Sequence, residues 1–481
     1  MPAPSVLILG GGPSGMAASF ELARSSAPVT LIERAPQIGG LAKTLQFETP
    51  EGVFRTDIGP HRFFSKNAYL YALIGDLLKE HWNLIPRHTQ FFIGGKYYTY
   101  PARLKNILQQ MEKTRIFRMI TDYGYERMRS YVWPRTIRTF EDHALATFGR
   151  TLAEFNILNY TEKIWGIPCR EISVDWASQR IAGLNVRATL KAMFSSKTTA
   201  KSLVDSFYYP AHGSGLIYET MRQHLETYGG TVRTSSRPTR FALAGNRITD
   251  VEVETPEGLH TVKPDTVVCS IPITETVRLF GDAAPAAVRE AATALRFRAQ
   301  VYLFLTIARE RVTPDNWVYF PDKEIPFGRI SEMKNFSLLM APSNMTSLFL
   351  EFFCFEGDEI WQMSQERLTA LATEWLEKLG IVSRKDVRSA FMLKQEHVYP
   401  LYDLAYRAHA STILGWLDGL ENFYAIGRPG RFRYTNQDHS LEMGILAARS
   451  ILEGKRYDMD TVANSREYFE RGYVPTPQDN E

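Results

Sequence analysis

The fold is decided near the start of the chain, where residues 6–24 read VLILGGGPSGMAASFELAR. An apolar run, a glycine turn and a second apolar-rich segment predict a strand, a turn and a helix over residues 16–24. Gly10 permits the tight turn, Gly12 lets backbone approach a pyrophosphate, and Gly15 lets the helix pack on the sheet. The positive end of this helix then points at phosphate. The residues assigned to this dinucleotide site are Gly10, Gly12, Pro13, Ser14 and Gly15.

A second apolar run, VTLI at residues 29–32, ends in Glu33 about twenty residues after the turn. From the end of a strand, this carboxylate can accept hydrogen bonds from the ribose of an adenosine. Arg34 follows it and is assigned to the same site. Glycine turns are common, so the motif gains its meaning from the two strands and the carboxylate around it. The segment therefore predicts a Rossmann-like α/β domain that binds a dinucleotide.

The next residues distinguish between dinucleotides. GGLA at residues 39–42 stands where a nicotinamide-binding domain usually carries its next helix, and its backbone N–H groups are available to a second part of the ligand. A strand then ends in the turn GPH at residues 59–61. A nicotinamide binds transiently, whereas a flavin stays buried and needs backbone around its ring, so we expect FAD. For these residues alone, the alternative is a surface loop with one histidine. The residues assigned here are Gly39, Gly40, Leu41, Gly59, Pro60 and His61.

A second signature lies near the C-terminus, where residues 427–440 read GRPGRFRYTNQDHS. The pattern predicts a strand end, a basic glycine loop and a polar turn that caps a helix over residues 440–452, with Asp438 or Ser440 as a possible N-cap. Free N–H groups and the dipole at such a helix start stabilise negative charge on a reduced flavin ring. The residues assigned to the cofactor here are Gly427, Arg428, Asn436, Gln437 and Ser440.

Length and composition describe an ordinary globular protein. A chain of 481 residues is too long to fold around one hydrophobic core, so two or three domains are expected. A hydrophobic content of 44%, a charged content of 23% and a net charge of +3 imply neither a nucleic-acid tail nor a polybasic membrane patch. We expect no nucleic-acid partner, and the oligomeric state stays open.

The three cysteines, Cys169, Cys269 and Cys354, are far apart and lack CxxC spacing. They predict neither a disulfide framework nor a metal site. The first strand begins at residue 6, which leaves no room for a signal peptide, and no apolar run reaches membrane-spanning length. We therefore expect a cytoplasmic protein.

The order of predicted elements indicates interrupted domains. Residues 70–82 have the pattern of an amphipathic helix. A hairpin with a Gly-Gly turn at residues 91–101 precedes a mostly helical stretch, and strand patterns return after residue 230. We expect a Rossmann-like FAD-binding domain interrupted by a mostly helical domain and an antiparallel-sheet substrate domain. The predicted boundaries are 1–90, 205–290 and 395–455 for the FAD-binding domain, 91–204 for the helical domain, 291–394 for the substrate domain, and 456–481 for a tail.

Taken together, the motifs resemble the two-dinucleotide-binding-domain flavoproteins, a group that contains amine oxidases, protoporphyrinogen oxidase and UDP-galactopyranose mutase. Within that group the chain looks most similar to the mutase. The resemblance covers nearly the whole chain through short segments in the same order. These segments lie at 38–42, 59–61, 163–168, 176–185, 317–321, 326–329, 399–400 and 427–440.

The resemblance implies a mutase chemistry with non-covalent FAD that is active when reduced. In these mutases the N5 of reduced FAD attacks the anomeric carbon of a nucleotide sugar and expels the diphosphate, with no net redox change. NAD(P)H is a candidate external reductant. Bidentate arginines suit the charge on a departing diphosphate better than lysines do. The expected partner is therefore a nucleotide- or phosphate-activated sugar.

Matching positions assign further roles to individual residues. Arg180 and Arg329 match the two diphosphate clamps of the mutases. Arg428 matches a residue beside the flavin, and His61 matches the histidine over it. Three tyrosines match hydroxyl donors to the phosphates, namely Tyr319, Tyr399 and Tyr434. The residues expected to bind substrate are Tyr100, Arg103, Trp165 and Trp317.

The chain departs from the mutases where they bind uridine. Their Tyr-Pro step is followed by an aromatic residue and a glutamine, whereas Tyr100-Pro101 is followed here by Ala102-Arg103. Two further uracil-pocket positions align with Asn156 and Thr161. Without an aromatic ring to stack on uracil and amide side chains to hydrogen-bond with it, a UDP sugar is a less suitable substrate.

Two classes of enzyme therefore stay open. The first is a mutase-like enzyme for a diphosphate-activated sugar. The second is an FAD-dependent oxidase, dehydrogenase or desaturase of the amine oxidase and protoporphyrinogen oxidase type. The paired arginines and the tyrosines favour the first, because a neutral hydride donor has no need of them. A flavin-binding protein without activity is a third interpretation.

Overall fold

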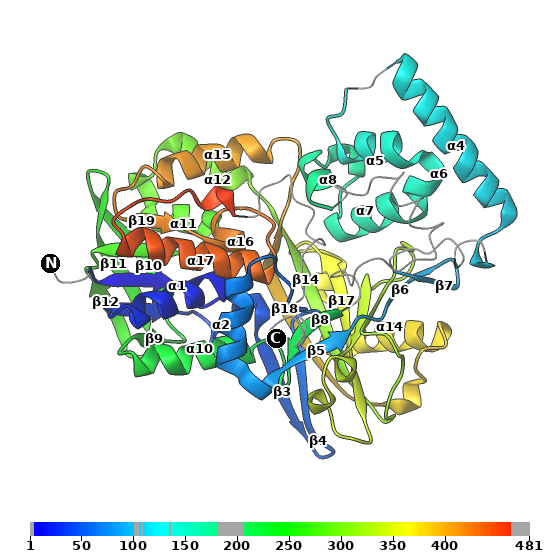
Figure 1. Ribbon diagram of the computed structural model, residues 1–481, viewed down its shortest axis with the longest axis horizontal. Helices are drawn as coiled ribbons and strands as arrows, with labels where there is room; N and C mark the ends of the chain where they lie inside the picture. The colour runs from blue at the N-terminus through cyan, green and yellow to red at the C-terminus, as the bar shows by residue number, and fades with distance from the viewer. Residues whose placement is uncertain (1–3, 101–105, 107–108, 134–135, 181–205, 463–481) are drawn as a thin grey trace.

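The computed structural model describes residues 4–100, 106, 109–133, 136–180 and 206–462, with backbone only at 178–180 (Figure 1). The described chain combines helices with one parallel sheet, a seven-stranded sheet that is antiparallel except for the parallel pair of β6 and β15, and smaller antiparallel sheets. It has the mixed α/β architecture that the sequence predicts. Within these ranges, no helix is both long and apolar enough to cross a bilayer.

A five-stranded parallel sheet carries the predicted dinucleotide motif. Its strand order is β19-β13-β1-β2-β9, so the first strand of the chain lies in the middle. Each pair along this order is parallel. The strands are β1 (Val6–Leu9), β2 (Val29–Ile32), β9 (Thr231–Arg233), β13 (Thr266–Cys269) and β19 (Phe423–Ala425). The sheet thus collects segments separated by hundreds of residues.

Both faces of this sheet are covered. Val6 and Ile8 of β1 belong to the core under α1, α10 and α17, whereas Leu7 and Leu9 belong to the core on the other face, as alternation along a strand requires. The helices of the first face are α1 (Pro13–Arg24), α2 (Ala68–Leu78), α10 (Leu216–Thr227) and α17 (Gln437–Leu452). The second face holds α11 (Ile273–Phe280), α12 (Ala286–Ala294), α15 (Tyr406–Leu417) and the antiparallel sheet of β10 (Arg237–Ala244), β11 (Arg247–Thr255) and β12 (Gly258–Val262).

A seven-stranded sheet lies beside the parallel one, in the order β18-β14-β17-β16-β15-β6-β7 (Figure 1). The hairpin expected in the helical domain joins its edge, because β6 pairs with β15. Gly94 and Gly95 form the predicted turn at φ +56° and +78°. The strands are β6 (Thr89–Ile93), β7 (Lys96–Thr99), β14 (Phe297–Ile307), β15 (Trp317–Tyr319), β16 (Arg329–Glu332), β17 (Thr346–Cys354) and β18 (Val387–Pro400). Helices α13 (Glu359–Gln362) and α14 (Gln365–Lys378) contribute to its covered face.

A helical unit lies above the seven-stranded sheet in the view of Figure 1, and its buried side chains join the core on the second face of the parallel sheet. It contains α4 (Lys113–Val132), α5 (Phe140–Phe148), α6 (Arg150–Leu152), a π-helical turn at Ala153–Leu158, α7 (Asn159–Trp165) and α8 (Asp175–Arg180). Two small antiparallel ribbons complete the described chain. They are β3 (Thr44–Thr49) with β4 (Gly52–Asp57), and β5 (Trp82–Pro86) with β8 (Ser206–Pro210).

The helix expected over residues 70–82 is shorter than predicted. It ends at Leu78, a 3₁₀ turn follows at Lys79–His81, and Trp82 begins β5. Trp82 pairs with Pro210 of β8 and stacks on Tyr208, with ring centroids 5.1 Å apart. This partner lies more than a hundred residues away, so local periodicity could not anticipate it.

Candidate active site

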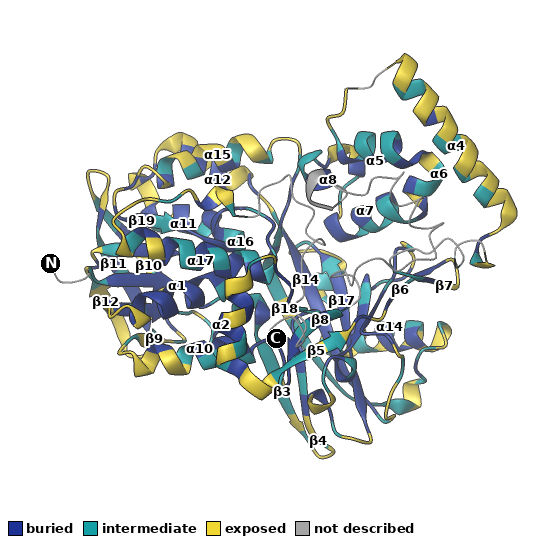
Figure 2. Cartoon of the chain, in the orientation of Figure 1, coloured by how far each residue is buried: buried dark blue, intermediate teal, exposed yellow. Residues whose placement is uncertain are grey.

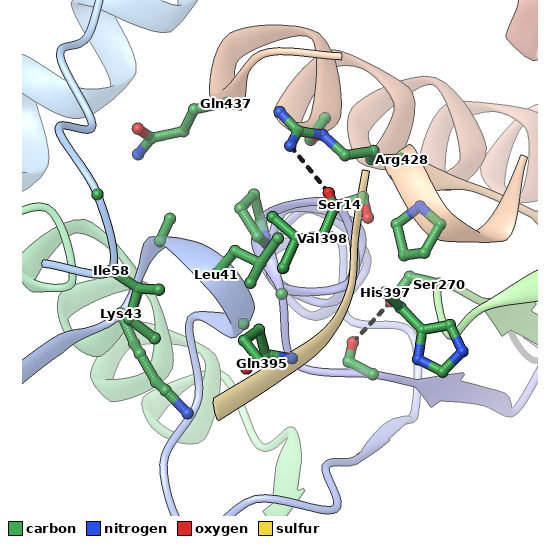
Figure 3. A pocket seen from close by; sticks show the side chains of 18 of the residues that line it. Ser14, Leu41, Lys43, Ile58, Ser270, Gln395, His397, Val398, Arg428 and Gln437 are labelled. Atoms are coloured by element: carbon green, nitrogen blue, oxygen red, sulfur yellow. Dashed lines mark hydrogen bonds between the residues drawn. The ribbon is translucent and has the colours of Figure 1, made fainter. Parts of the chain in front are cut away.

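A cavity of about 710 Å³ lies between the parallel sheet and the seven-stranded sheet (Figure 3). Its walls come from the ends of β1 and β2, the starts of α1 and α17, the turn after β4, and strands of the seven-stranded sheet. The structure therefore brings distant segments to one space. The predicted residues that line it are Gly10, Gly12, Pro13, Ser14, Glu33, Arg34, Gly40, Leu41, Gly59, Pro60, His61, Trp317, Tyr319, Arg329, Tyr399, Arg428, Tyr434, Asn436, Gln437 and Ser440.

The glycine turn has the geometry that its three roles require. Gly10 lies at φ +99°, a conformation that L side chains rarely adopt. A Cβ on Gly15 would overlap the carbonyl oxygen of Gly10, so helix and turn pack backbone against backbone. Gly12 has an open side, since a Cβ there would meet only the Cα of Gly40 at 3.9 Å. Gly12 and Ser14 line the cavity, whereas Gly15 serves the packing behind it.

The second glycine pair packs directly on the first. Gly39 and Gly40 have φ values of +100° and +54°, and the Gly39 N–H donates to the carbonyl of Gly11 at 2.7 Å. A Cβ on Gly40 would stand 3.0 Å from the Cα of Gly12. Gly40 and Leu41 line the cavity, while Gly39 does not. Gly39 therefore acts on the site through the backbone it supports.

Glu33 is held by backbone at the end of β2. Its Oε2 accepts from the Gly11 N–H at 2.7 Å, and its Oε1 accepts from the Ala35 N–H at 2.8 Å. A carboxylate has about four acceptor positions, so these two bonds leave capacity for ligand hydroxyls. Arg34 beside it is half exposed and lies 3.9 Å from Glu275.

The last helix begins earlier than predicted. Its N-cap is Asn436, whose side chain and the imidazole of His439 form a capping box, so neither Asp438 nor Ser440 is the N-cap. Residue 440 lies inside α17 because the capping box closes the first turn. Ser440 instead donates to the Asn436 carbonyl at 3.1 Å. The start of α17 reaches the cavity and directs its positive dipole end there.

The predicted basic glycine loop is a single helical turn, α16 (Gly427–Gly430). Gly427 does not line the cavity; a Cβ there would overlap Ser14 Oγ, so this glycine seats α16 on α1. Gly444 plays the same part for α17, since a Cβ there would overlap the Ser14 carbonyl oxygen. Close backbone packing thus keeps the starts of α1 and α17 side by side.

Arg428 is the loop arginine that reaches the cavity. Its Nε donates to the Thr435 carbonyl at 2.9 Å, and its guanidinium carbon lies 4.7 Å from the Tyr434 ring centroid and 5.5 Å from that of Tyr399. Figure 3 shows it across the cavity from Leu41. Arg431, by contrast, is buried between the carboxylates of Asp418 and Asp460 and serves the core.

His61 is a neutral histidine at the cavity wall. Its Nε2 lies 2.8 Å from the Ile58 carbonyl, which can only accept, so Nε2 carries the proton. Burial is the main cause that lowers the pKa of His61 to about 4, and the charges of Arg428 and Arg329 lower it further. At neutral pH the ring is therefore uncharged.

Arg329 is paired before any ligand arrives. Its Nε and Nη2 donate to the two oxygens of Glu351 at 2.6 and 2.7 Å, and this carboxylate is buried. Burial alone would lower the pKa of Arg329, but the Glu351 charge reverses the effect and raises it well above its usual value. Gln300 donates to Glu351 Oε2 at 3.2 Å and accepts from Tyr302 at 2.5 Å. The arginine is thus fixed by a buried polar chain.

The three predicted tyrosines line the same end of the cavity as Arg329. The rings of Tyr399 and Tyr434 are stacked with centroids 5.8 Å apart, and the Tyr319 ring centroid is 5.9 Å from the Arg329 guanidinium carbon. Burial and the neighbouring Tyr434 raise the pKa of Tyr399 to about 12, so its hydroxyl keeps its proton and can donate.

Two residues predicted to bind substrate lie away from the cavity. Trp165 is fully buried and packs edge-on against Trp176, with centroids 4.7 Å apart, because α7 turns this side chain into the core. Tyr100 contacts Phe91 and stands behind Tyr319. Arg103 and the side chain of Arg180 lie outside the described residues.

The sequence interpretation missed Glu351 and its partners Gln300 and Tyr302. Glu351 stands alone in the apolar strand TSLFLEFFC, and Gln300 interrupts the apolar strand β14. A buried carboxylate needs a cation or several donors. That rule, applied to Glu351, could have predicted a buried partner such as Arg329, although not its position.

The family described as "Flavin containing amine oxidoreductase" matches residues 13–452, from the first turn of α1 to the end of α17. The chain belongs to this family. Membership implies FAD as the cofactor and a flavoenzyme as the class of protein. The backbone-lined part of the cavity, with open space over Gly12 and a carboxylate at Glu33, fits the adenosine diphosphate part of that group.

Relatives of known name agree with this assignment. A probable UDP-galactopyranose mutase from Klebsiella pneumoniae is 27% identical over 179 residues, which cover 35% of this chain and 42% of that protein. A carotenoid phi-ring synthase from Chlorobaculum tepidum is 24% identical over 157 residues, which cover 30% of this chain and 24% of that protein. The matched parts thus span less than half of either relative.

Solved structures share the whole fold. Reduced UDP-galactopyranose mutase aligns with a TM-score of 0.82 at 21% identity and covers 97% of both chains. A putative protoporphyrinogen oxidase from Exiguobacterium sp. 255-15 aligns with a TM-score of 0.69 at 16% identity, over 94% of this chain and all of that one. The resemblance inferred from sequence is confirmed, and these identities show the fold alone.

Proposed function

We propose that this flavoenzyme is a mutase-like enzyme that acts on a diphosphate-activated sugar. The observation that carries the proposal is Arg329, which lines the cavity and is fixed by two hydrogen bonds to the buried Glu351. Arg428 lines the same cavity. A departing diphosphate needs fixed cations and donors, whereas an uncharged hydride donor does not.

The pairing with Glu351 fixes the orientation of the Arg329 guanidinium in the cavity. Two of the three guanidinium nitrogens of Arg329 bond to Glu351, and Nη1 has no hydrogen bond to any residue that the structure describes. The arginine therefore needs no reorganisation to meet a phosphate oxygen with Nη1. The hydroxyls of Tyr319, Tyr399 and Tyr434 add neutral donors around the same position.

We assign FAD to the remainder of the cavity. Gly12, Ser14 and Glu33 would hold its adenosine diphosphate part, and the turn at Gly59 to His61, Arg428 and the start of α17 would hold its ring. When bound and reduced, FAD supplies a nucleophilic nitrogen. The protein contributes the neutral ring of His61 and the positive end of α17.

The nucleotide part of the substrate need not be uridine. Asn156 and Thr161, which align with the uracil pocket of the mutases, do not line the cavity. The aromatic residue and the glutamine that contact uridine in the mutases are also replaced here, by Ala102 and Arg103. The proposal therefore names the diphosphate and the sugar, and leaves the base open.

An FAD-dependent oxidoreductase is the second candidate, and Glu351 favours it. Its charge offsets that of Arg329, so the pair is close to neutral toward a ligand. A less positive site would suit a neutral or amine substrate better than a diphosphate.

Redox behaviour distinguishes the candidates. Purified holoenzyme would be screened against nucleotide sugars by flavin absorbance, once oxidised and once reduced with dithionite or NADPH, and products would be analysed for isomerisation. We expect binding and isomerisation only after reduction, together with a flavin–sugar adduct that cyanoborohydride traps. Flavin reduction by an added substrate, with electrons passed to oxygen or a quinone, would instead establish the oxidoreductase.

A further inference from the structure

Helix α4 presents its apolar face to solvent. It stands at the outer edge of the helical unit, and Figure 2 colours most of its length as exposed. Phe117, Ile120 and Met128 are each more than 60% exposed, and Tyr131 is 92% exposed. Globular proteins normally turn such a stripe inward. The feature therefore needs a covering surface.

The opposite face of α4 already has its own contacts. Ile116 and Met119 pack against the small core of Ile93, Tyr98 and Phe155, and the Arg115 guanidinium carbon lies 4.6 Å from the Phe155 ring centroid. Glu126 is buried on the same side. The helix is thus anchored to the protein, and its exposed stripe is a separate face.

The stripe is continuous along the helix. At 100° per residue, Phe117, Ile120, Tyr125, Met128 and Tyr131 fall within a sector of roughly 140°. Val132 lies in the same sector, and Trp133, 76% exposed, extends the apolar surface past the end of the helix. Aromatic side chains with a polar edge are suited to the boundary between lipid and water.

Arginines border the stripe. On the same helical projection, Arg118 and Arg129 lie along one edge and Arg127 along the other, with Lys113 near the first turn. The helix carries five basic residues, Lys113, Arg115, Arg118, Arg127 and Arg129, against two acidic ones, Asp122 and Glu126. Helix α4 is therefore strongly basic and apolar on its exposed face, although the net charge of the whole chain is only +3.

We propose that α4 docks the protein on an anionic lipid surface, with the stripe from Phe117 to Trp133 in the headgroup region and the bordering arginines on lipid phosphates. The helix lies on such a surface and does not span it. Charge favours this occupant over a second copy of the chain, because a two-fold interface through α4 would bring like-charged arginines together. The proposal is independent of the catalytic assignment.

Vesicle flotation of the holoenzyme tests the proposal. We expect the protein to float with phosphatidylcholine vesicles that contain phosphatidylglycerol, and to float less with pure phosphatidylcholine or at high salt. Combined Phe117→Ser, Met128→Ser and Tyr131→Ser substitutions should weaken binding at least tenfold. Combined Arg118→Gln, Arg127→Gln and Arg129→Gln substitutions should do the same.

Matched controls lie on other surfaces. Leu259→Ser removes a comparably exposed apolar side chain from β12, and a triple change of Arg222, Arg289 and Arg449 to Gln removes the same charge from α10, α12 and α17. Both controls should bind vesicles like the wild type, and all variants should keep their circular dichroism and bound flavin. The proposal would be overturned if the wild type did not float with vesicles, or if the controls lost as much vesicle binding as the α4 variants. It would also be overturned if light scattering showed a dimer that only the α4 variants dissociate.

Discussion

The two ends of the cavity are built by different means. At the end around Gly12, backbone packs on backbone, and the contacts come from residues 10–15 and 39–40, which are close in sequence. At the end around Arg329, side chains from β15, β16, β17, β18 and the segment before α17 meet, although they lie as far apart in sequence as Tyr319 and Tyr434. The first end depends on the absence of side chains, and the second depends on their pairing. Substitutions should therefore fail in different ways at the two ends.

The largest effect is expected at the backbone-built end. Gly15→Ala places a Cβ on the Gly10 carbonyl oxygen, so α1 must move away from the turn. We expect a loss of more than about 3 kcal/mol in the free energy of unfolding and a colourless protein. Urea unfolding and the flavin absorbance of the purified protein measure this. Gly75→Ala in α2 is the matched control, because its Cβ meets nothing within 4 Å. Equal flavin content in both variants would contradict the packing role of Gly15.

At the side-chain end, Glu351→Gln tests the buried pair. Removing one charge leaves Arg329 without its counter-ion, which costs about 3 kcal/mol of stability. FAD should stay bound, because the glycine turn is unchanged. This variant should therefore lose stability without losing cofactor. A double variant, Glu351→Leu with Arg329→Met, should be more stable than either single change. Additive losses in this cycle would show that the pair does not act as a unit.

Arg329→Lys probes the same end for catalysis. Lysine keeps a charge but cannot make both bonds to Glu351 while offering a third nitrogen, so we expect turnover of the isomerisation to fall by about a hundredfold. The KM should change less if the arginine acts mainly on the developing charge. Turnover close to that of the wild type would remove the role assigned to Arg329.

A pH dependence is expected where the two ends meet, at His61. Its folded pKa of about 4 lies below the unfolded value, so the unfolded state binds more protons as pH falls from about 6.5 to 4, and stability decreases over that window. His61→Asn should flatten this part of the unfolding curve. Asp57, whose pKa burial raises to about 7, acts in the opposite direction in both proteins and cancels in the difference. Identical curves would show that His61 is not held neutral.

The smallest effect concerns the start of α17. Asn436→Ala removes an N-cap and should cost about 1 kcal/mol. Because this cap lines the cavity, FAD affinity should fall with it. Ser364→Ala removes the N-cap of α14, which lies away from the cavity. It should lower stability by a similar amount to Asn436→Ala without changing FAD affinity. Titration of apoprotein with FAD distinguishes the two outcomes.

The difference between the two ends of the cavity also explains which features could be predicted from the sequence. Strand β1, the glycine turn, Glu33 and the Gly-Gly hairpin follow from local rules of backbone conformation. The predicted helix end at residue 82 was wrong, because Trp82 pairs with a distant strand. The predicted N-cap at Asp438 or Ser440 was wrong, because Asn436 and His439 form the capping box. Glu351 was missed because its partner Arg329 is adjacent only once β16 and β17 pair. Trp165 was misplaced because a conspicuous aromatic residue is more often core than site.

The position of β1 at the centre of its sheet has a consequence for biosynthesis. Its neighbour β2 follows directly, but its other neighbour β13 leaves the ribosome some 260 residues later, by the register Val6 to Thr266, and β19, which pairs with β13, comes later still. One edge of β1 in the nascent nucleotide motif therefore stays unpaired until more than half of the chain has been translated, and the sheet is complete only after β19. We expect such a polypeptide to depend on chaperone protection, and truncations before α17 to be degraded instead of forming a smaller flavin-binding unit.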